Sequence, residues 1–441
     1  MKQLLDRILF VLRKMQFCIT ILLLVSNNIN IRIGSDAFHL KSVITKNNKH
    51  YSSTSRSRSS ILLFSTSEKT STTTTTNNND NNEITGLYEI QEELITKRGQ
   101  FEETLMKNNK YSLLETYKPV IKGLGLGGGF GGGGGGMGGA SSKSKSKKNN
   151  NKKKKSSSKK NTNKAALKAE GKEYAKTFRD DGVVRMDAVL SDDTAVDLRS
   201  FLFDLRLTAT EEVTNGSIGG KHRFANVLLR KNRCDLTAPL GPDIIYKALY
   251  ELLVKSPIGA TVSQTLGDDA VLYELSCMIS DPGSSRQVIH PDTPCDVDNP
   301  ILITTFVALQ DITLDMGPTC WLPRTHKPEI YKVFQQEDGS PSPKDGLLQS
   351  TDYVLGVLPR GSCGMFDSRL LHCGTANNSS VERAVFYVSF RRATCGYPGN
   401  PGSIRPELID RLTLEGLQNE LEIYQKKGSS TVLTKLANSL R

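Results

Sequence analysis

The chain has 441 residues, a formal net charge of +12 and a hydrophobic content of 37%. Eleven lysines lie between residues 143 and 164 with no acidic residue among them, so the rest of the chain carries a net charge of only +1. This distribution excludes a strongly basic folded surface, and nucleic-acid recognition would have to rest on that lysine-rich stretch alone.

The eight cysteines argue against a fold held together by disulfides or zinc. None of them forms a C-x-x-C pair, and their spacing matches neither a zinc site nor a dense disulfide framework. We therefore expect mostly reduced thiols, seven of them within the folded part of the chain.

Residues 1–67 have the pattern of a targeting region. Basic residues precede a short apolar core at 17–25, which is typical of a signal peptide and too short for a stable membrane span; an amphipathic anchor is the alternative. Residues 34–39 (G-S-D-A-F-H) resemble the junction of two-part plastid presequences in algae with secondary plastids. The following stretch, up to residue 67, is rich in Ser, Thr, Lys and Arg and lacks acids, as transit peptides do. We expect import into a plastid, with the ER or secretory pathway as the alternative.

Residues 68–164 are predicted to be a long, mostly disordered region. The Thr/Asn-rich tract at 70–82 is too polar to bury a core, and the glycine run at 123–139 is a flexible linker. The apolar spacing at 84–121 predicts one or two short helices that dock on the folded domain or on a partner. The lysine run at 143–164 is expected to be a solvated spacer; weak contact with an anionic membrane or nucleic acid is the alternative.

The folded domain is predicted to span residues 165–441 and to begin with helices. Residues 165–179 favour a helix by propensity, and 182–186 read as a short strand. Ser191 is a typical N-cap for a helix that continues to Leu205, and another helix is expected over 243–255.

Beyond residue 255 the hydrophobic period changes from that of helices to that of strands. Strands are expected at 270–279, 301–309, 319–323, 353–358, 363–366 and 383–390, followed by a terminal helix over 406–425. Residues 211–240 and 327–350 are interpreted as loops. Helices followed by strands predict an α+β fold with a sandwich or barrel in the C-terminal half.

The stretch from 286 to 294 (R-Q-V-I-H-P-D-T-P) carries a candidate metal motif. In a strand, His290 and Asp292 would project from the same face and could both reach one ion. His372, beside an apolar run, is the candidate for a third ligand. Two histidines and one carboxylate on one side of an ion, with the other positions open, is the facial triad of non-haem Fe(II) oxygenases. A lone H-x-D pair is a weak signal, because such pairs are common and usually structural.

Arg383 follows His372 by eleven residues, at the start of an expected strand. A guanidinium group binds a carboxylate in a bidentate geometry that lysine cannot reproduce. This suits an enzyme whose dicarboxylate co-substrate chelates the metal at one end and needs a fixed cation at the other.

These motifs together resemble the 2-oxoglutarate-dependent phytanoyl-CoA dioxygenase family. The pattern is H-x-D at 290–292 followed by H-x10-R at 372–383. Similar segments are F-R-D-D-G-V-V at 178–184, F-V-A-L-Q-D at 306–311, G-P-T at 317–319 and L-P-R-T-H-K at 322–327. The resemblance covers about residues 170–405. It departs from the family at Arg324-Thr325, which replaces Gly-Ser, and at Gly374, which replaces a small polar residue.

The resemblance implies a double-stranded β-helix (jelly roll, cupin-like) with helices packed on one sheet. It also implies that His290, Asp292 and His372 bind Fe(II) and that Arg383 holds the far carboxylate of 2-oxoglutarate. Phe306 stands where the family often has Trp and would form an aromatic wall, and His326 would support the metal site or the substrate. Those assignments name six site residues: His290, Asp292, His372, Arg383, Phe306 and His326.

The expected function is that of an oxidoreductase that uses Fe(II), 2-oxoglutarate and O2 to hydroxylate a small molecule, lipid-like or another metabolite. Related halogenases lack the carboxylate ligand, so Asp292 favours hydroxylation. The alternative is a catalytically silent β-helix scaffold that binds partners through its lysine-rich arm. We expect a monomer or homodimer without specific nucleic-acid binding.

Overall fold

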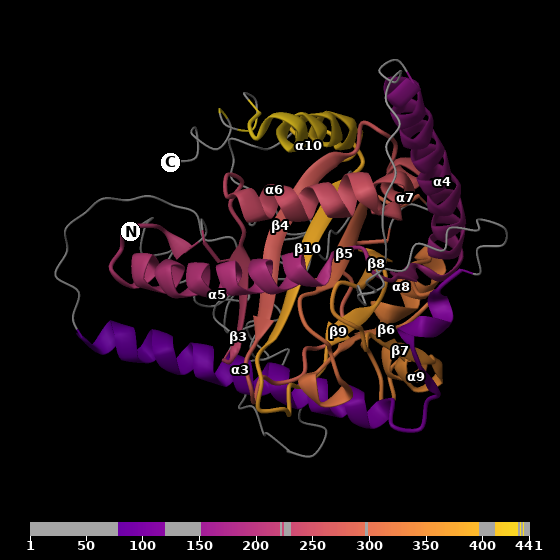
Figure 1. Cartoon of the computed structure of the whole chain (residues 1–441). Coiled ribbons are helices and arrows are strands. Elements are labelled where there is room, and N and C mark those ends of the chain that lie inside the picture. The colour runs from indigo at the N-terminus through magenta and orange to yellow at the C-terminus, as the bar shows by residue number, and fades with distance from the viewer. Residues whose placement is uncertain are drawn as a thin grey trace, which may run out of the picture. The chain divides into compact units, whose positions relative to one another are not determined.

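The computed structural model describes residues 78–119, 151–220, 223–224, 231–295, 299–396 and 411–430, together with 433 and 435 (Figure 1). The predicted targeting region, the glycine linker and the lysines before residue 151 lie outside this range. The chain divides into two compact units, Met1–Arg98 and Gly99–Arg441, and helix α3 (Asn78–Leu105) crosses the boundary. Over the described ranges, no helix has the length and apolar character needed to cross a membrane.

Two sheets form the centre of the second unit, which is mixed α/β. The major sheet has six antiparallel strands, in the order β2 (Val183–Met186), β8 (Cys363–Asp367), β5 (Leu302–Ala308), β10 (Arg383–Arg391), β4 (Val271–Ser280) and β3 (Arg233–Thr237). The minor sheet has the order β1 (Tyr111–Leu113), β7 (Tyr353–Leu355), β6 (Thr319–Trp321) and β9 (His372–Gly374). Only β1 and β7 pair in parallel; the other pairs of the minor sheet are antiparallel.

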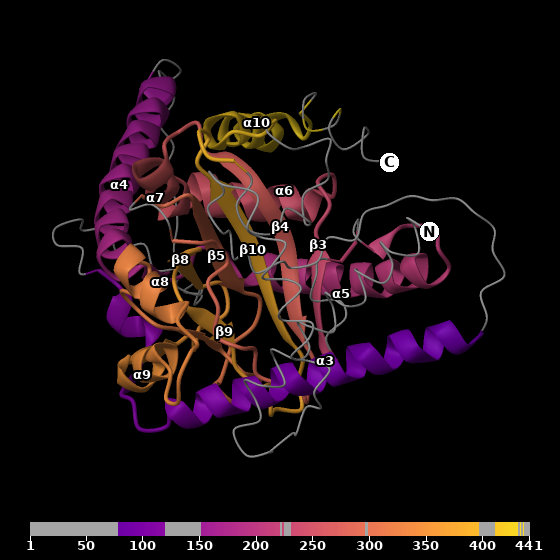
Figure 2. The same ribbon diagram turned by 180° about the vertical axis from the view of Figure 1, so that it is seen from behind.

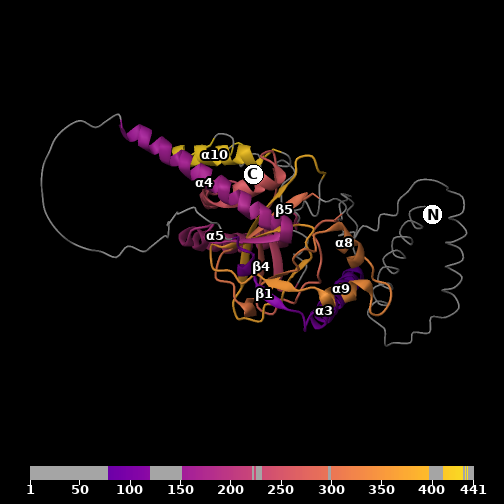
Figure 3. The ribbon, with the colours of Figure 1, turned by 90° about the vertical axis from the view of Figure 1, so that its right-hand side faces the viewer.

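Helices cover one face of the major sheet. They are α4 (Asn151–Asp181), α5 (Asp192–Thr214), α6 (Asp243–Tyr250), the π turn η5 (Glu251–Lys255), α7 (Pro257–Leu266) and α10 (Leu414–Lys427). Figure 1 and Figure 2 show α5, α6, α7 and α10 lying across the strands, and Figure 3 shows α4 and α10 on the same side of them. Alternate residues of each strand, such as Phe386 and Val388, enter the core beneath these helices.

The opposite face of the major sheet packs against the minor sheet. Trp321, Phe366 and Leu114 are fully buried in the apolar core between the sheets. Polar residues also lie on this face, because Arg383 and Tyr387 of β10 alternate with the residues that face the helices. Arg383 is therefore positioned between the two sheets rather than under the helices.

Residues 99–119, here called the N-terminal strap, are an integral part of the second unit. Strand β1 extends the minor sheet, and the short helix η2 (Leu114–Tyr117) follows it. The Asn109 side chain donates hydrogen bonds of 2.7 Å to the carbonyls of Leu348 and Thr351. The end of the strap is fixed by an ion pair of 2.7 Å between Lys118 and Asp187. The docking helix predicted over 84–121 thus docks on the domain in its 99–119 part.

The boundaries of the first folded helix differ from the expectation. It was predicted to begin at Ala165, but α4 begins at Asn151, so residues 151–164 are helical rather than a disordered spacer. Extension of an existing helix costs little compared with nucleation, and α4 is packed against α7 further along its length. The domain start predicted at residue 165 therefore lies inside a helix, and the compact unit reaches back to Gly99.

Residues 327–350 were interpreted as a loop, which is wrong. They contain α8 (Pro328–Phe334) and α9 (Pro343–Ser350). Both prolines occupy first-turn positions, where the missing N–H is not needed, and Ser342 and Asp345 form a capping box. The prolines that suggested a loop are helix start signals.

Three other expectations need correction. Residues 233–237, placed in a loop, form the edge strand β3. Helix α7 was not expected at all, although Ser256 caps it and Pro257 opens it. The terminal helix predicted over 406–425 is α10, which begins at Leu414; residues 406–410 lie outside the described part.

Candidate metal centre

A short antiparallel ladder joins the loop of His290 and Asp292 to strand β9. His290 and His372 exchange two backbone hydrogen bonds, each of 3.0 Å between N and O. The Asp292 N–H donates to the Ser368 carbonyl at 2.7 Å. Residues far apart in sequence are therefore held in one register, and the three predicted ligands come together through backbone pairing.

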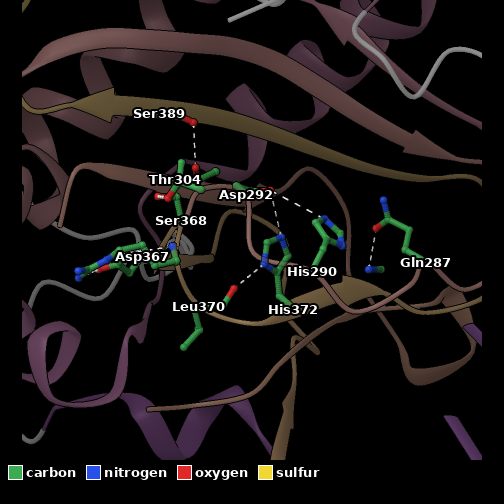
Figure 4. A network of polar contacts seen from close by, with 12 residues as sticks. Gln287, His290, Asp292, Thr304, Asp367, Ser368, Leu370, His372 and Ser389 are labelled. Carbon is green, nitrogen blue, oxygen red and sulfur yellow. Dashed lines mark hydrogen bonds and ion pairs between the residues drawn. The ribbon is translucent and has the colours of Figure 1, made fainter. Parts of the chain in front are cut away.

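The three side chains converge on one point (Figure 4). One ligand atom from each of His290, Asp292 and His372 lies within 4.8 Å of the others. The Asp292 Oδ1 atom is 3.8 Å from Nε2 of His290 and 3.5 Å from Nε2 of His372. The His290 and Asp292 side chains keep 38% and 34% of their surface exposed, compared with 6% for His372, so the site opens on the side of His290 and Asp292.

Each histidine is held in the tautomer that a metal requires. Nδ1 of His372 lies 2.9 Å from the Leu370 carbonyl, and Nδ1 of His290 lies 2.7 Å from the Val288 carbonyl. Because a carbonyl oxygen can only accept, each Nδ1 carries the proton and donates it. The lone pair is then on Nε2, the atom that faces Asp292, and the ring orientation is fixed by the backbone.

The electrostatics of the triad also suit a cation. Burial lowers the pKa of His372 to about 4, although the Leu370 carbonyl opposes this, so the ring is neutral near pH 7. Loss of solvation raises the pKa of the Asp292 carboxyl, and neighbouring His290 lowers it. A bound divalent ion would stabilise the carboxylate form of Asp292.

Gln287 closes the outer end of the ladder and explains one departure from the family pattern. Its N–H donates to the Gly374 carbonyl at 2.9 Å, and its Oε1 accepts from the Gly374 N–H at 2.7 Å. A Cβ on residue 374 would lie only 2.7 Å from that Oε1 atom. The hydrogen bond between Gln287 Oε1 and the backbone of residue 374 therefore favours glycine at this position.

The N-terminal strap supports the same loop from the other side. Oε2 of Glu102, a fully buried residue, accepts the Ile289 N–H at 2.7 Å, next to the ligand His290. Lys344 Nζ lies 4.0 Å from the other carboxylate oxygen. Met106 of the strap contacts the Arg286 guanidinium through its sulfur at 3.8 Å. A segment outside the region of family resemblance thus fixes the backbone of the metal-ligand loop.

Arg383 is a buried cation whose hydrogen bonds are incomplete. It is 3% exposed, and its Nη2 donates to Ser280 Oγ at 3.0 Å, while Nε and Nη1 have no partner within the described part of the chain. Arg233 on β3 lies beyond the same Ser280 and donates to it at 3.2 Å. Burial and nearby Arg233 lower the pKa of Arg383 to about 9.

The two open donors of Arg383, beside a second buried guanidinium group, fit an anion. A carboxylate between Arg383 and Arg233 would satisfy the orphaned donors and offset the repulsion between the cations. The donor set of two imidazoles and one carboxylate fits Fe(II) as well. The residues present therefore fit both groups that the sequence predicts, a metal ion and a dicarboxylate.

An aromatic row leads away from the triad along the inner face of the major sheet. The rings of His372 and Phe366 are 4.8 Å apart, Phe366 and Phe306 5.0 Å, and Phe306 and Tyr387 5.5 Å. Phe306 is therefore joined to the triad through Phe366.

His326 has partners of its own. Its Nε2 atom is 3.1 Å from the Arg179 carbonyl, and its ring lies against Gly182. The structure brings His290, Asp292 and His372 into one cluster but does not include His326 in it. These contacts favour a role in joining α4 to the site over direct contact with a metal.

Sequence reasoning did not single out Arg233, Glu102 or Gly374 as functional support. Arg233 could have been found, because the polar residues of R-C-D-L-T alternate as in a strand with one polar face. Glu102 gives no local signal, since its role depends on a backbone group almost two hundred residues away.

Comparison with known proteins agrees with this geometry. The model of the phytanoyl-CoA dioxygenase (PhyH) family matches residues 178–385, which include the triad and Arg383. The dioxygenase FrzG of Cladobotryum sp is 25% identical over 264 residues, which cover 55% of this chain and 81% of that protein.

Solved structures with a similar course of the chain are more distant. The epimerase SnoN in complex with Fe3+, alpha ketoglutarate and nogalamycin RO is 19% identical, with a TM-score of 0.37, over 52% of this chain and 85% of that one. HygX from Streptomyces hygroscopicus with nickel and 2-oxoglutarate bound is 13% identical, with a TM-score of 0.35, over 49% and 85%. The family match over residues 178–385 and the dioxygenase relative show an oxygenase-type enzyme that is similar to the phytanoyl-CoA dioxygenase family.

Proposed function

We propose that the chain is an Fe(II)- and 2-oxoglutarate-dependent dioxygenase that hydroxylates a small molecule and releases succinate and CO2. The observation that carries this proposal is the cluster of His290, Asp292 and His372, whose ligand atoms lie within 4.8 Å of one another. The fold that we propose for the two facing sheets is a double-stranded β-helix, since both are mainly antiparallel and enclose the site.

His290, Asp292 and His372 would hold Fe(II), and Arg383 would hold the far carboxylate of 2-oxoglutarate. When bound together, Fe(II) and 2-oxoglutarate would supply the oxidation: O2 gives one oxygen atom to succinate as CO2 leaves, and the other to a C–H bond of the substrate. Because both histidines donate through Nδ1 to backbone carbonyls, they hold their Nε2 lone pairs toward the ion without reorganisation.

The remaining groups orient the co-substrate and limit water. Ser280 Oγ lies between the two guanidinium groups and fixes Arg383 while leaving its Nε and Nη1 free to donate. Phe366 and Phe306 cover the buried side of the triad with apolar rings. Electrostatic contacts are stronger where water is excluded.

Asp292 supports hydroxylation as the reaction type. With a metal bound, its carboxylate would take a coordination position that a halide ion would otherwise need. The alternative is a catalytically silent scaffold; the clustering of the three candidate ligands and the open donors of buried Arg383 favour the enzyme.

Release of labelled CO2 from 1-¹⁴C-2-oxoglutarate tests the proposal on the full chain. We expect Fe(II)-dependent release that is lost in His372→Ala and reduced at least about a hundredfold in Arg383→Ala, since a buried charged contact is removed. Arg360→Ala, at an exposed arginine paired with Asp192, is the matched control and should keep wild-type release. Release that is independent of Fe(II), or equal in His372→Ala, would refute the proposal.

Location and partners follow from the sequence alone. We propose import into a plastid through residues 1–67, a monomeric or homodimeric state, and at most weak contact of residues 143–164 with anionic surfaces. Imaging a fluorescent fusion of residues 1–67 in an alga with a secondary plastid checks the first point; a signal confined to the ER would refute it.

A further inference from the structure

A second group of acids, one buried and one half-buried, lies on the inner face of the major sheet. Asp235 is on β3 and Glu274 on β4, two neighbouring strands. Cys234 and Leu236, which flank Asp235, belong to the core under the helices. Because side chains alternate along a strand, Asp235 points to the other face, toward the minor sheet. This group is distinct from the metal triad.

Each acid has one neutral donor. Tyr387 Oη donates to Asp235 Oδ2 at 2.6 Å, and Ser389 Oγ donates to Glu274 Oε2 at 2.6 Å. Ser389 is joined to Thr304 at 3.0 Å. The acids are thus fixed in place by β10 and β5, and their donors do not supply a positive charge.

Unsatisfied acceptors lie beside them. Asp235 Oδ1 and Thr237 Oγ1, both on β3 and both in residues 6% exposed, have no hydrogen-bond partner among the described residues. Residues 235 and 237 project from the same face of the strand. Buried polar atoms without partners are rare and require an explanation, such as a missing ligand.

The acids face the metal centre. The Asp292 carboxylate raises the pKa of both Asp235 and Glu274, after the larger effect of burial. Figure 4 shows Ser389, which donates to Glu274, joined to Thr304 in the same close-up view as Asp292. The aromatic row from His372 ends at Tyr387, the donor to Asp235. A molecule that contacts these acids would therefore lie close to the ion.

A cation that would neutralise them is not provided by the described part of the chain, in which neither Asp235 nor Glu274 forms an ion pair. Arg233, two residues before Asp235, directs its guanidinium to Ser280 Oγ and the Ser285 carbonyl instead. Burial of a carboxyl group without a counter-charge is costly, and here it raises the pKa to about 7 for Asp235 and about 8 for Glu274.

We propose that Asp235, Glu274 and Thr237 bind a basic nitrogen of the substrate, so that the substrate class is a cationic amine. The inference rests on the proposed oxygenase function and specifies its substrate. An ammonium group has a positive charge and donors for the open Asp235 Oδ1 and Thr237 Oγ1 atoms, and Glu274 on the neighbouring strand β4 adds a second acid on the same face. Held there, the amine positions neighbouring C–H bonds of the substrate near the ion.

The test uses a set of small probes that are matched in shape and differ in charge. Benzylamine, benzyl alcohol and benzoate differ in charge but share a ring that suits the aromatic row. Each is titrated anaerobically into the full chain loaded with Fe(II) and 2-oxoglutarate, and the visible charge-transfer band and the melting temperature are followed. We expect benzylamine to bind at least about tenfold more tightly than the alcohol, because hydrogen bonds to charged groups are the stronger ones.

Variants connect the preference to the acids. Asp235→Asn/Glu274→Gln should keep the band and lose the preference for benzylamine. The control Asp193→Asn/Glu211→Gln removes two exposed acids from α5. It should keep both the charge-transfer band and the preference for benzylamine. The inference is overturned if no probe binds, if the alcohol or benzoate binds as well as the amine, or if the preference survives in Asp235→Asn/Glu274→Gln.

The proposed function can fail separately. If the wild-type chain gives no charge-transfer band at all, that function is refuted. The inference about the acids is then decided by the change in melting temperature on adding benzylamine, a measurement that needs no metal. This change is compared among the wild type, Asp235→Asn/Glu274→Gln and Asp193→Asn/Glu211→Gln.

Discussion

Single residues at the metal centre act through backbone groups as much as through side chains. The triad was predictable from sequence, because H-x-D and H-x10-R place the ligands and Arg383 at fixed local spacings. Gln287 and Arg233 were not, since their roles arise only when strands distant in sequence pair. Gly374, which sequence analysis treated as a departure from the family, is explained by its contact with Gln287.

The Gln287–Gly374 contact predicts coupled effects on metal affinity. Gly374→Ala places a Cβ against Gln287 Oε1, and Gln287→Ala removes the hydrogen bond to the Gly374 N–H. Each variant should weaken Fe(II) binding by loosening the ladder. The double variant should bind Fe(II) with about the same affinity as the single variant that binds it more weakly. The coupling energy between the two substitutions should be about 0.5–3 kcal/mol. Fe(II) titrations of the wild type, the two single variants and the double variant measure this coupling energy. If the losses of Fe(II) affinity in the single variants add up in the double variant, the shared contact is contradicted.

The acids of the inner face predict how stability depends on pH. Their folded pKa values of about 7 and about 8 lie above the unfolded values near 4, so the folded state binds more protons in between. Stability must then fall as the pH rises through this window. Without metal or substrate, the melting temperature of the wild type should drop more from pH 5 to about pH 8.5 than that of Asp235→Asn/Glu274→Gln. Equal drops would show that these carboxyl groups titrate normally.

At the scale of elements, strands were easier to predict than the segments between them. The apolar runs that became β4, β5, β8 and β10 carry strong local patterns. Helices α8 and α9 were missed because Pro and Ser act at helix starts as well as in loops. The docking of the N-terminal strap depends on pairing of β1 with β7, which no local pattern of a three-residue strand specifies.

Glu102 tests whether the strap supports the metal site. Glu102→Ala leaves the buried Ile289 N–H without an acceptor next to His290. Loss of such a supporting contact should weaken Fe(II) binding by about 10- to 100-fold. Glu102→Gln keeps an oxygen acceptor and should restore most of the affinity. Glu103→Ala, at the exposed neighbour, is the control; the same affinity in both alanine variants would contradict the role of Glu102.

At the scale of the whole molecule, the functional unit begins before the glycine and lysine segments. The compact unit spans Gly99–Arg441, whereas the family match begins at residue 178. Composition alone separated residues 99–119 from the domain, because a polar linker usually marks a boundary. Here the N-terminal strap, which precedes the linker, supplies three things to the domain. They are strand β1, the Asn109 side chain that donates to the Leu348 carbonyl, and the buried Glu102 carboxylate.

Truncation tests this view of the unit. A chain that begins at Asn151 lacks the strap, whereas one that begins at Gly99 keeps it. The shorter chain should melt at a lower temperature and bind Fe(II) more weakly, because the apolar contacts of Met106 and Leu114 are lost together with the Glu102 hydrogen bond. The longer chain should match the full protein. Identical melting and affinity of the two truncated chains would show that the strap is dispensable.

The central claim is tested most directly by anaerobic titration of the full chain with Fe(II) and 2-oxoglutarate, followed in the visible spectrum. The account predicts a weak metal-to-ligand charge-transfer band for the wild type that is absent in both His290→Ala and Arg383→Ala. A folded wild-type chain that binds Fe(II) but gives no band, or a band that persists in both variants, would contradict it.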